Sequence, residues 1–228
     1  MATAPKATGI SPARRTQIVH MDGVGWDGYR DLRRMRGDRG RPRIIFLDGD
    51  AWLMSPGYIH ERWAERLGAI VHQITTELDI PYAPAGQTTL WLEHRKVGVE
   101  PDKSYYFANE PRVRDKKHLF MGQDPPPDLA IEAVNTRAAK AAIECYRRLE
   151  VPEIWVGRSS GVRFFGRDAA GDYRAISASR SLPFLTAVEV TEWVLRPMDG
   201  PETRWNRAMR DWVRDVLGPR AGIVPPQP

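Results

Sequence analysis

The segment spanning residues 128–156 constrains the fold of this chain most, because its pattern predicts a strand, a helix and a second strand in direct succession. It opens on an apolar run, Leu129 to Val134, that contains a single acid, Glu132. Burying an unpaired carboxylate costs several kcal/mol or shifts its pKa, so an acid in such a run indicates a salt bridge, a metal ligand or a catalytic proton. The mixture of strands and helices along the chain predicts an α/β or α+β fold rather than a solenoid or an all-helical bundle.

The composition is that of an ordinary globular protein. The chain has 228 residues, 42% hydrophobic and 28% charged, which favours one domain or one domain with extensions. A net charge of +5 and an isoelectric point of about 9.5 are compatible with a polyanionic partner without establishing one. The single cysteine, Cys145, excludes an internal disulfide and fits a reducing compartment, and its place in a helical pattern predicts a packed thiol. With no apolar stretch of membrane-spanning length and no secretion signal, we expect a cytoplasmic protein without a membrane partner.

The N-terminal part combines a polar tail with a basic cluster. Residues 1–18 are predicted to form a flexible tail ahead of a domain over residues 19–197. A short helix is expected around 26–35. The basic cluster is either a solvated surface or a patch that contacts phosphates, and it consists of Arg30, Arg33, Arg34, Arg36, Arg39, Arg41 and Arg43.

Two short apolar runs around an Asp-Gly-Asp turn predict a β-hairpin over residues 44–54. Behind it, apolar side chains recur every three or four residues, which predicts a helix over 59–78 with one apolar stripe. His60, Glu61 and Glu65 lie off that stripe, where a solvated surface position competes with a role in a site.

The rest of the chain predicts further strands and one more long helix. A polar, proline-rich stretch at 109–127 is expected to be a surface loop. A capped segment is predicted at 188–194, and residues 198–228 follow the domain with an amphipathic helix at 202–217 and a Gly/Pro-rich tail. The remaining strands are predicted at 81–86, 88–93, 103–107, 161–166 and 173–176.

Asp102 and Glu132 are the residues most suited to chemistry. Asp102 follows a proline at the entry to one predicted strand, and Glu132 lies in another. If these strands are neighbours, both carboxylates face one point, where a divalent cation such as Mg²⁺ finds oxygen ligands. Such a cation polarises a phosphoryl oxygen and lowers the pKa of an attacking water, and a nearby lysine stabilises charge at phosphorus. The scattered histidines are expected to be surface or hydrogen-bonded side chains rather than ligands; they include His60, His72, His94 and His118.

Four segments in a fixed order resemble landmarks of the Uma-two family, bacterial proteins described as putative restriction endonucleases. Order and spacing agree over roughly residues 25–195. The segments are Leu-Asp-Gly-Asp-Ala-Trp-Leu-Met-Ser-Pro (47–56) with His60 and the long helix behind it, Val-Glu-Pro-Asp (99–102), Pro-Asp-Leu-Ala-Ile-Glu-Ala-Val (127–134), and Tyr146 followed after four residues by Val-Pro-Glu-Ile-Trp-Val (151–156).

The resemblance implies a restriction-endonuclease-like fold, in which a central mixed sheet is flanked by helices and follows an N-terminal hairpin. It also implies the PD-(D/E)xK arrangement of metal ligands. Asp102 and Glu132 would be the metal-binding acids, with Mg²⁺ or Mn²⁺ as the cofactor. A glutamate from the first long helix sometimes joins such a site, and here Glu61 is the first candidate and Glu65 the second.

This sequence departs from the family pattern at the lysine. Val134 stands where a Glu-x-Lys motif would place it, and Ala141 and Ala142 stand where many members carry one on the following helix. Lys140 is the nearest lysine and the candidate charge stabiliser. A shift of one or two helical positions turns a side chain by about 100° or 200°, so Lys140 reaches the site only if its long stem bends back or the helix start is irregular.

Three functions remain open at this stage. The first is a metal-dependent endonuclease that hydrolyses phosphodiester bonds in DNA with metal-activated water, as a monomer or a homodimer. The second is a catalytically degenerate member of the same fold that binds nucleic acid or a protein. The third is a structural partner that docks through the helix carrying Trp205 and Trp212.

Overall fold

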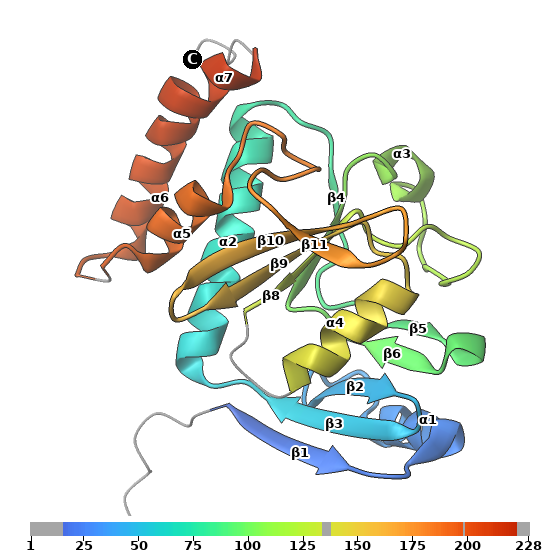
Figure 1. Cartoon of the computed structure of the whole chain (residues 1–228). Coiled ribbons are helices and arrows are strands. Elements are labelled where there is room, and N and C mark those ends of the chain that lie inside the picture. The colour runs from blue at the N-terminus through green and yellow to red at the C-terminus, as the bar shows by residue number, and fades with distance from the viewer. Residues whose placement is uncertain (1–15, 134–137, 198, 223–228) are drawn as a thin grey trace, which may run out of the picture.

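The computed structural model of the protein describes residues 16–133, 138–197 and 199–222 (Figure 1). None of the helices in these ranges is long and apolar enough to cross a membrane. The strands are β1 Gln17–Met21, β2 Arg43–Leu47, β3 Asp50–Ser55, β4 Ala83–Pro84, β5 Leu90–Leu92, β6 Val97–Val99, β7 Lys103–Tyr106, β8 Leu129–Glu132, β9 Glu153–Arg158, β10 Gly161–Arg167 and β11 Tyr173–Ile176. The helices are α1 Gly25–Arg36, α2 Tyr58–Glu77, α3 Glu110–Val113, α4 Ala138–Arg148, α5 Ala187–Leu195, α6 Glu202–Trp212 and α7 Gly218–Ala221, with a 3₁₀ turn η1 Glu93–Arg95 and a π-helical turn η2 Val213–Leu217.

The strands form two sheets. The predicted hairpin, β2 and β3, lies in a five-stranded antiparallel sheet with the order β1-β3-β2-β6-β5. The second sheet has six strands in the order β11-β10-β9-β8-β7-β4, and it is mixed because β8 and β9 run parallel while the other pairs are antiparallel. The predicted mixed sheet flanked by helices is confirmed, and β1, β6 and β5 extend the predicted hairpin into a sheet of its own.

The predicted strand, helix and strand of the organising segment are β8, α4 and β9. Parallel neighbours need a crossover connection, and α4 supplies it. The helix packs on β2 and β6 of the five-stranded sheet (Figure 1). Cys145 and Tyr146 on its inner face are fully buried, and burial raises the pKa of the Cys145 thiol. The position of Cys145 is that of the packed thiol predicted from its helical pattern.

Helix α2 packs against the mixed sheet on the face away from α4. The predicted apolar stripe is buried there, with Leu67, Ile70 and Ile74 in one cluster with Leu129 and Trp155 of the sheet. Because the helix is anchored along this stripe, the residues that begin it are held in a fixed position beside the strand ends. Those first residues include His60 and Glu61.

The C-terminal helices pack on α2. Trp205 and Met209 of α6 belong to the same core cluster as Leu67, and Trp205 Nε1 donates to the carbonyl of Trp193 at 2.9 Å. Arg66 of α2, also buried, donates to the carbonyl of Arg196 and to the carboxylate of Glu202. The amphipathic face carrying Trp205 therefore packs on its own domain, not on a partner.

Two local features were not predicted. Strand β1 begins at Gln17, so the last two residues of the predicted tail are part of the five-stranded sheet, while residues 1–15 lie outside the described ranges. The stretch 109–127 contains the short helix α3, and Asp128, buried behind it, accepts from the backbone N–H groups of Phe107 and Asn109.

We predict that the C-terminal segment contributes to global stability through side chains facing α2. Leu217→Ala removes a fully buried side chain and is expected to lower the free energy of unfolding by about 2–5 kcal/mol. The adjacent Val216 is 39% exposed, and Val216→Ala should change it by about 0.5 kcal/mol or less. Urea denaturation of both variants measures the difference, and equal effects would show that this segment is not part of the core.

Candidate active site

Strand pairing places Asp102 and Glu132 opposite each other. β7 and β8 are antiparallel, with Lys103 opposite Ile131. Continuing this register by one residue puts Asp102 opposite Glu132, and side chains at opposite positions of neighbouring strands point to the same face of a sheet. The backbone N–H of Ala133 donates to Asp102 Oδ2 at 2.6 Å, which ties the start of β7 to the end of β8. The two acids that the sequence singled out are brought together.

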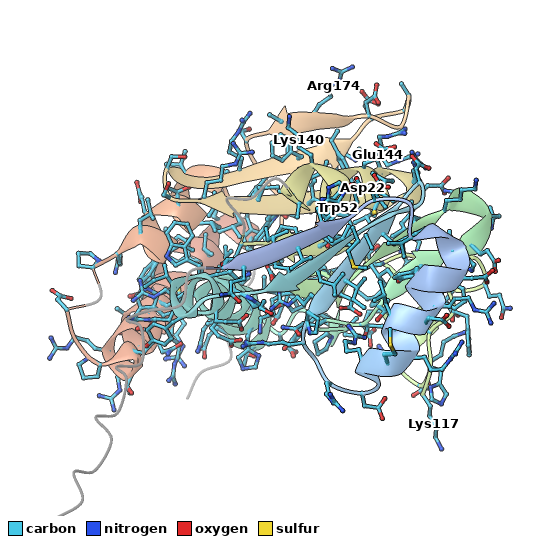
Figure 2. The ribbon with its side chains drawn as sticks, turned by 90° about the horizontal axis from the view of Figure 1, so that it is seen from below. Asp22, Trp52, Lys117, Lys140, Glu144 and Arg174 are labelled. Atoms are coloured by element: carbon cyan, nitrogen blue, oxygen red, sulfur yellow. The ribbon has the colours of Figure 1, made fainter. Side chains whose placement is uncertain are left out.

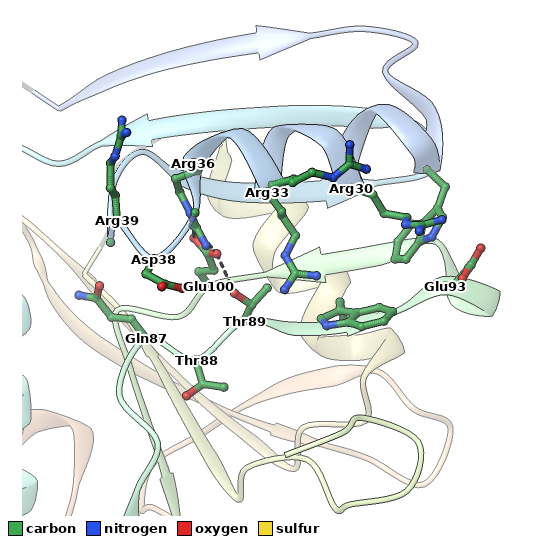
Figure 3. A pocket seen from close by; sticks show the side chains of 15 residues that line it. Arg30, Arg33, Arg36, Asp38, Arg39, Gln87, Thr88, Thr89, Glu93 and Glu100 are labelled. Atoms are coloured by element: carbon green, nitrogen blue, oxygen red, sulfur yellow. Dashed lines mark hydrogen bonds and ion pairs between the residues drawn. The ribbon is translucent and has the colours of Figure 1, made fainter. Parts of the chain in front are cut away.

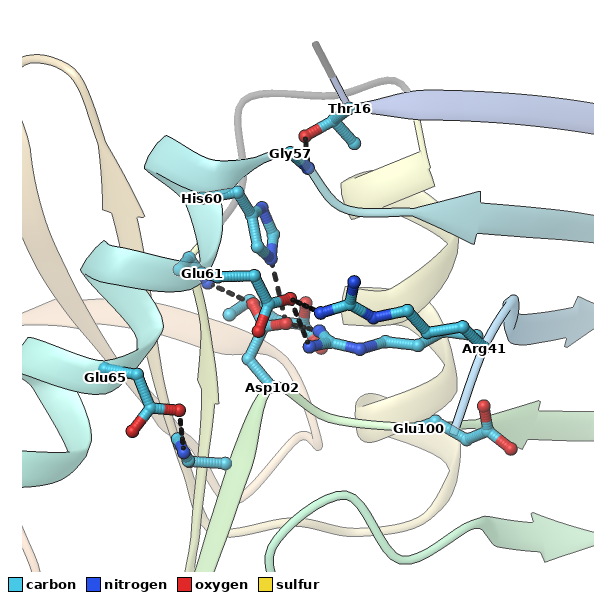
Figure 4. Close-up of polar contacts among 12 residues, drawn as sticks. Thr16, Arg41, Gly57, His60, Glu61, Glu65, Glu100 and Asp102 are labelled. Atoms are coloured by element: carbon cyan, nitrogen blue, oxygen red, sulfur yellow. Dashed lines mark hydrogen bonds and ion pairs between the residues drawn. The ribbon is translucent and has the colours of Figure 1, made fainter. Parts of the chain in front are cut away.

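Asp102 is fully buried where the chain passes from one sheet to the other, between the end of β6 and the start of β7. Its Oδ1 pairs with the guanidinium of Arg43, which lies on β2 and is buried as well. His60 Nε2 lies 3.0 Å from the same oxygen. Figure 4 shows His60 and Glu61 of α2 on one side of Asp102 and Arg41 on the other.

Arg43 also joins Glu61 to this centre. Its Nη2 lies 3.1 Å from Glu61 Oε1, and Arg41 Nη2 lies 3.2 Å from the same oxygen. Burial and the charges of Arg43 and Arg41 lower the pKa of His60 to about 4. The imidazole is therefore neutral at pH 7, and in the tautomer that carries its proton on Nε2 it donates to Asp102 Oδ1.

Glu132 is held from the opposite side by α4. The phenol of Tyr146, fully buried, donates to Glu132 Oε1. Burial raises the pKa of Glu132 to about 7, against the smaller opposing effects of the Tyr146 hydrogen bond and the Arg43 charge. Burial and the adjacent Glu132 also raise the pKa of Tyr146 well above its ordinary value, so the phenol remains a donor. The unusual feature of this site is that the carboxyl of Glu132, buried in a strand, has a pKa near neutral pH.

The other candidate residues lie at different distances from this centre. Glu65 is exposed and pairs with Lys103, its Oε1 lying 2.8 Å from Nζ, so Glu61 is the acid of α2 that reaches Arg43. Lys140 is exposed near the start of α4, and among the described residues no contact ties it to either acid (Figure 2). Ala141 and Ala142, at the positions where many relatives carry lysine, are buried. Val134 lies outside the described ranges.

Sequence reasoning missed the partners of the two acids. Arg43 was assigned to the basic cluster, as a solvated or phosphate-contacting residue, yet it is buried and neutralises acids. One signal was available, because Arg43 directly precedes the apolar run of β2 and shares a face with Ile45 in that strand. Tyr146 entered the sequence argument only as a family landmark, without a role, and His60 as a surface or hydrogen-bonded side chain.

The donor types at this centre suit a hard divalent cation, although among the described residues the ligand atoms of Asp102, Glu132 and Glu61 do not all lie within 4.8 Å of one another. Asp102, Glu132 and Glu61 offer carboxylate oxygens, the ligands that Mg²⁺ and Mn²⁺ take, and at Glu132 the effect of burial on the pKa outweighs that of the Arg43 charge. A cation at Asp102 would share that carboxylate with Arg43 or displace the guanidinium. Within the described residues, three ligand atoms within 4.8 Å of one another occur at His20, Asp22 and Asp50, on the other end of the five-stranded sheet, where exposure makes such a grouping ordinary.

A mixed sheet flanked by helices, with a buried acid pair at paired strand ends, defines a restriction-endonuclease-like protein. The family model Uma2, described as "Putative restriction endonuclease", matches residues 26–198, more than half of the chain, and the chain belongs to this family, the Uma-two family that its motifs resemble. The crystal structure of a "putative nuclease belonging to DUF820" from Anabaena variabilis, at 1.96 Å resolution, is similar in fold, with a TM-score of 0.50 and 13% sequence identity over 68% of this chain and 92% of that one. No curated protein matches the chain.

We predict that Glu132 makes the stability of the metal-free protein pH-dependent. Its pKa is about 7 in the folded state and about 4.5 in the unfolded chain, so between these values the folded protein holds a proton that the unfolded chain has released. Stability from this group is complete below about pH 4.5 and is lost as the pH rises to 7. The free energy of unfolding of Glu132→Gln minus that of the wild type should therefore increase by an amount on the order of 3 kcal/mol from pH 4.5 to pH 7.5.

His60 acts in the opposite direction, because its lowered pKa makes stability rise between about pH 4 and 6.5. Both proteins keep His60, so its contribution cancels in the difference between wild type and variant. Chemical denaturation in EDTA across this pH range measures that difference. A difference independent of pH would contradict the assignment of Glu132 as a buried, poorly compensated acid.

Proposed function

We propose that this protein is a divalent-metal-dependent endonuclease that hydrolyses phosphodiester bonds in DNA. The observation that supports it most is the placement of Asp102 and Glu132 on one face of paired strand ends, both buried, with Glu61 joined to them through Arg43. Membership of a family described as restriction endonucleases supports a nucleic-acid substrate, and proteins of this kind generally use divalent metals.

In this proposal Asp102 and Glu132 hold the cation, and Glu61 is the accessory acid. A divalent cation bound there would polarise a phosphoryl oxygen and lower the pKa of the attacking water. Before the cation binds, Arg43 and His60 hold Asp102 in one orientation. Tyr146 does the same for Glu132.

The proposal needs a positive charge to stabilise the phosphorane-like transition state. Lys140 was the candidate from the sequence, and it would have to bend back from an exposed position on α4. Arg43 already lies at the acids, and a guanidinium matches phosphate oxygens as well as carboxylates. We therefore assign the stabilising charge first to Arg43, if phosphate or the cation draws it from Asp102, and second to Lys140.

Cleavage of supercoiled plasmid with Mg²⁺ or Mn²⁺ tests this assignment. Asp102→Asn and Glu132→Gln remove a carboxylate charge while keeping side-chain shape, and each should lower the nicking rate by about 100-fold or more, because a ligand to the ion is lost. Glu65→Gln is the matched control, an acid on the same helix as Glu61 that points to Lys103, and it should cut like the wild type. Equal nicking by Asp102→Asn and the wild type would contradict the site.

A second function is favoured by one specific observation. The positions where many relatives carry lysine hold buried alanines, Ala141 and Ala142, and Lys140 is exposed. A degenerate member of the family would bind nucleic acid without cutting it. It would show binding that weakens as salt rises, with no product in either metal.

A further inference from the structure

A wide groove lies beside the acid site, between helix α1 and the loop at 114–120. It consists of two hollows of about 830 and 800 Å³ that share a wall containing Arg33, Thr89 and Trp91. Figure 3 shows the first hollow, with Arg30, Arg33 and Arg36 of α1 facing the 87–91 segment. We call the two hollows together the basic groove.

The basic groove carries cations that the protein does not neutralise. Among the described residues, Arg33, Arg39 and Lys117 line it without a carboxylate within 4.0 Å, and Lys117 projects from the surface in Figure 2. The other lining arginines and lysine pair with acids, namely Arg30 with Asp27, Arg34 with Asp31, Arg36 with Glu100, Arg114 with Glu110 and Lys116 with Asp124. The acids Asp38 and Glu93 also line the groove without cancelling its positive character. Uncompensated cations along a groove are suited to a phosphate backbone.

Exposed aromatic rings accompany these cations. Trp91 is 38% exposed on the edge strand β5, and the Arg33 guanidinium lies over its ring, 5.4 Å from the centroid. Phe120, in the wall of the second hollow, is 57% exposed. Its loop is held in place, because Asp124 accepts from the backbone N–H of Phe120 at 2.8 Å and the Tyr106 phenol donates to the carbonyl of Pro125 at 3.1 Å. The Phe120 ring is thus held at the surface by its loop, and packing in the core does not explain its position.

Rings and cations together select one class of ligand. A duplex exposes its phosphates and keeps its base faces stacked inside. Its phosphates would therefore contact the arginines, but its bases could not stack on the aromatic rings of the groove. A single strand presents phosphates and unpaired base faces at once, and flat rings in a basic groove are the usual means of binding it. We propose that the basic groove binds single-stranded nucleic acid, with bases on Trp91 and Phe120 and phosphates on Arg33, Arg39 and Lys117.

The groove also leads toward the candidate active site. Glu100 lines the first hollow and stands two positions before Asp102 in the segment that joins β6 to β7. Its carboxylate accepts from Thr89 Oγ1 at 2.8 Å and from the backbone N–H of Ile44 at 3.0 Å, which fixes the groove wall to β2, the strand of Arg43. A strand held in the groove is thus positioned to reach the acids, and this delivery step, unlike the binding itself, rests on the proposed nuclease function.

Fluorescence anisotropy in EDTA, where no cleavage occurs, tests the binding. The probes are labelled oligodeoxyuridine and oligouridine of about 20 nucleotides, which differ only in the sugar, and a duplex of the same length. We expect the wild type to bind at least one single strand about 10-fold more tightly than the duplex near 0.15 M salt. Tighter binding of one of the two strands identifies the sugar, and equal binding shows recognition through bases and phosphates alone; either outcome supports the proposal.

Variants assign that binding to the groove. Phe120→Ala and Trp91→Ala should each weaken single-strand binding by about 10-fold with little change for the duplex. Tyr58→Ala, an exposed ring on α2 outside the groove, is the matched control and should bind like the wild type. Trp91→Ala could lose binding because the protein misfolds. Phe120→Ala tests the groove without this ambiguity, because Phe120 is exposed on a loop.

Binding and cleavage by the wild type separate the two proposals, because single-strand binding in EDTA requires no bound cation. Single-strand binding by a wild type that shows no cleavage with Mg²⁺ or Mn²⁺ would contradict the proposed nuclease function and leave the groove proposal intact. A duplex bound as tightly as the single strands, undetectable single-strand binding, or Phe120→Ala and Trp91→Ala variants that bind like the wild type would overturn the groove.

Discussion

The buried ion pair between Arg43 and Asp102 is the interaction on which the rest of this structure depends. Arg43 belongs to the five-stranded sheet, whereas Asp102 directly precedes β7 of the mixed sheet, so the pair joins the two sheets at their junction. Desolvating two charges costs about as much as their attraction returns, and removing one partner alone costs about 3–5 kcal/mol. Such a pair is a poor source of net stability. What it does provide is orientation, because Asp102 is fixed from three sides by Arg43, His60 and the N–H of Ala133.

The same junction carries the charges that the proposed chemistry uses. In the short segment between β6 and β7, Glu100 anchors Arg36 at the wall of the basic groove, and Asp102 anchors Arg43 at the acid site. Alternate positions along this segment thus pair with arginines that serve two different places. Glu132 differs from both acids, because its direct partner is the uncharged phenol of Tyr146 and burial raises its pKa to about 7. An added cation would find its least compensated ligand there.

Local patterns predicted the elements well and their assembly less well. The stripe of α2, the β2–β3 hairpin and the β8–α4–β9 unit follow from periodicity and turn chemistry, which act over a few residues. The pairing of β1 with β3, and of β6 with β2, joins segments far apart in the sequence, and no local pattern contains that information. Asp102 and Glu132 could be singled out from the sequence because they are acids at strand positions. The role of Arg43 could not, because it depends on a residue far away in the sequence. From the sequence alone, an arginine before an apolar run is interpreted as a surface residue. Its burial can be predicted only when the neighbouring segment is known to place a carboxylate beside it.

Anomalous diffraction from crystals soaked in Mn²⁺ would locate the cation directly. The arrangement of acids predicts an anomalous peak between the carboxylates of Asp102 and Glu132, with oxygen atoms at about 2.0–2.6 Å and the Arg43 guanidinium shifted from Asp102 Oδ1 or sharing its carboxylate. Crystals that show Mn²⁺ only at His20, Asp22 and Asp50, or at no position, with Arg43 still seated on Asp102, would contradict a metal site at these acids.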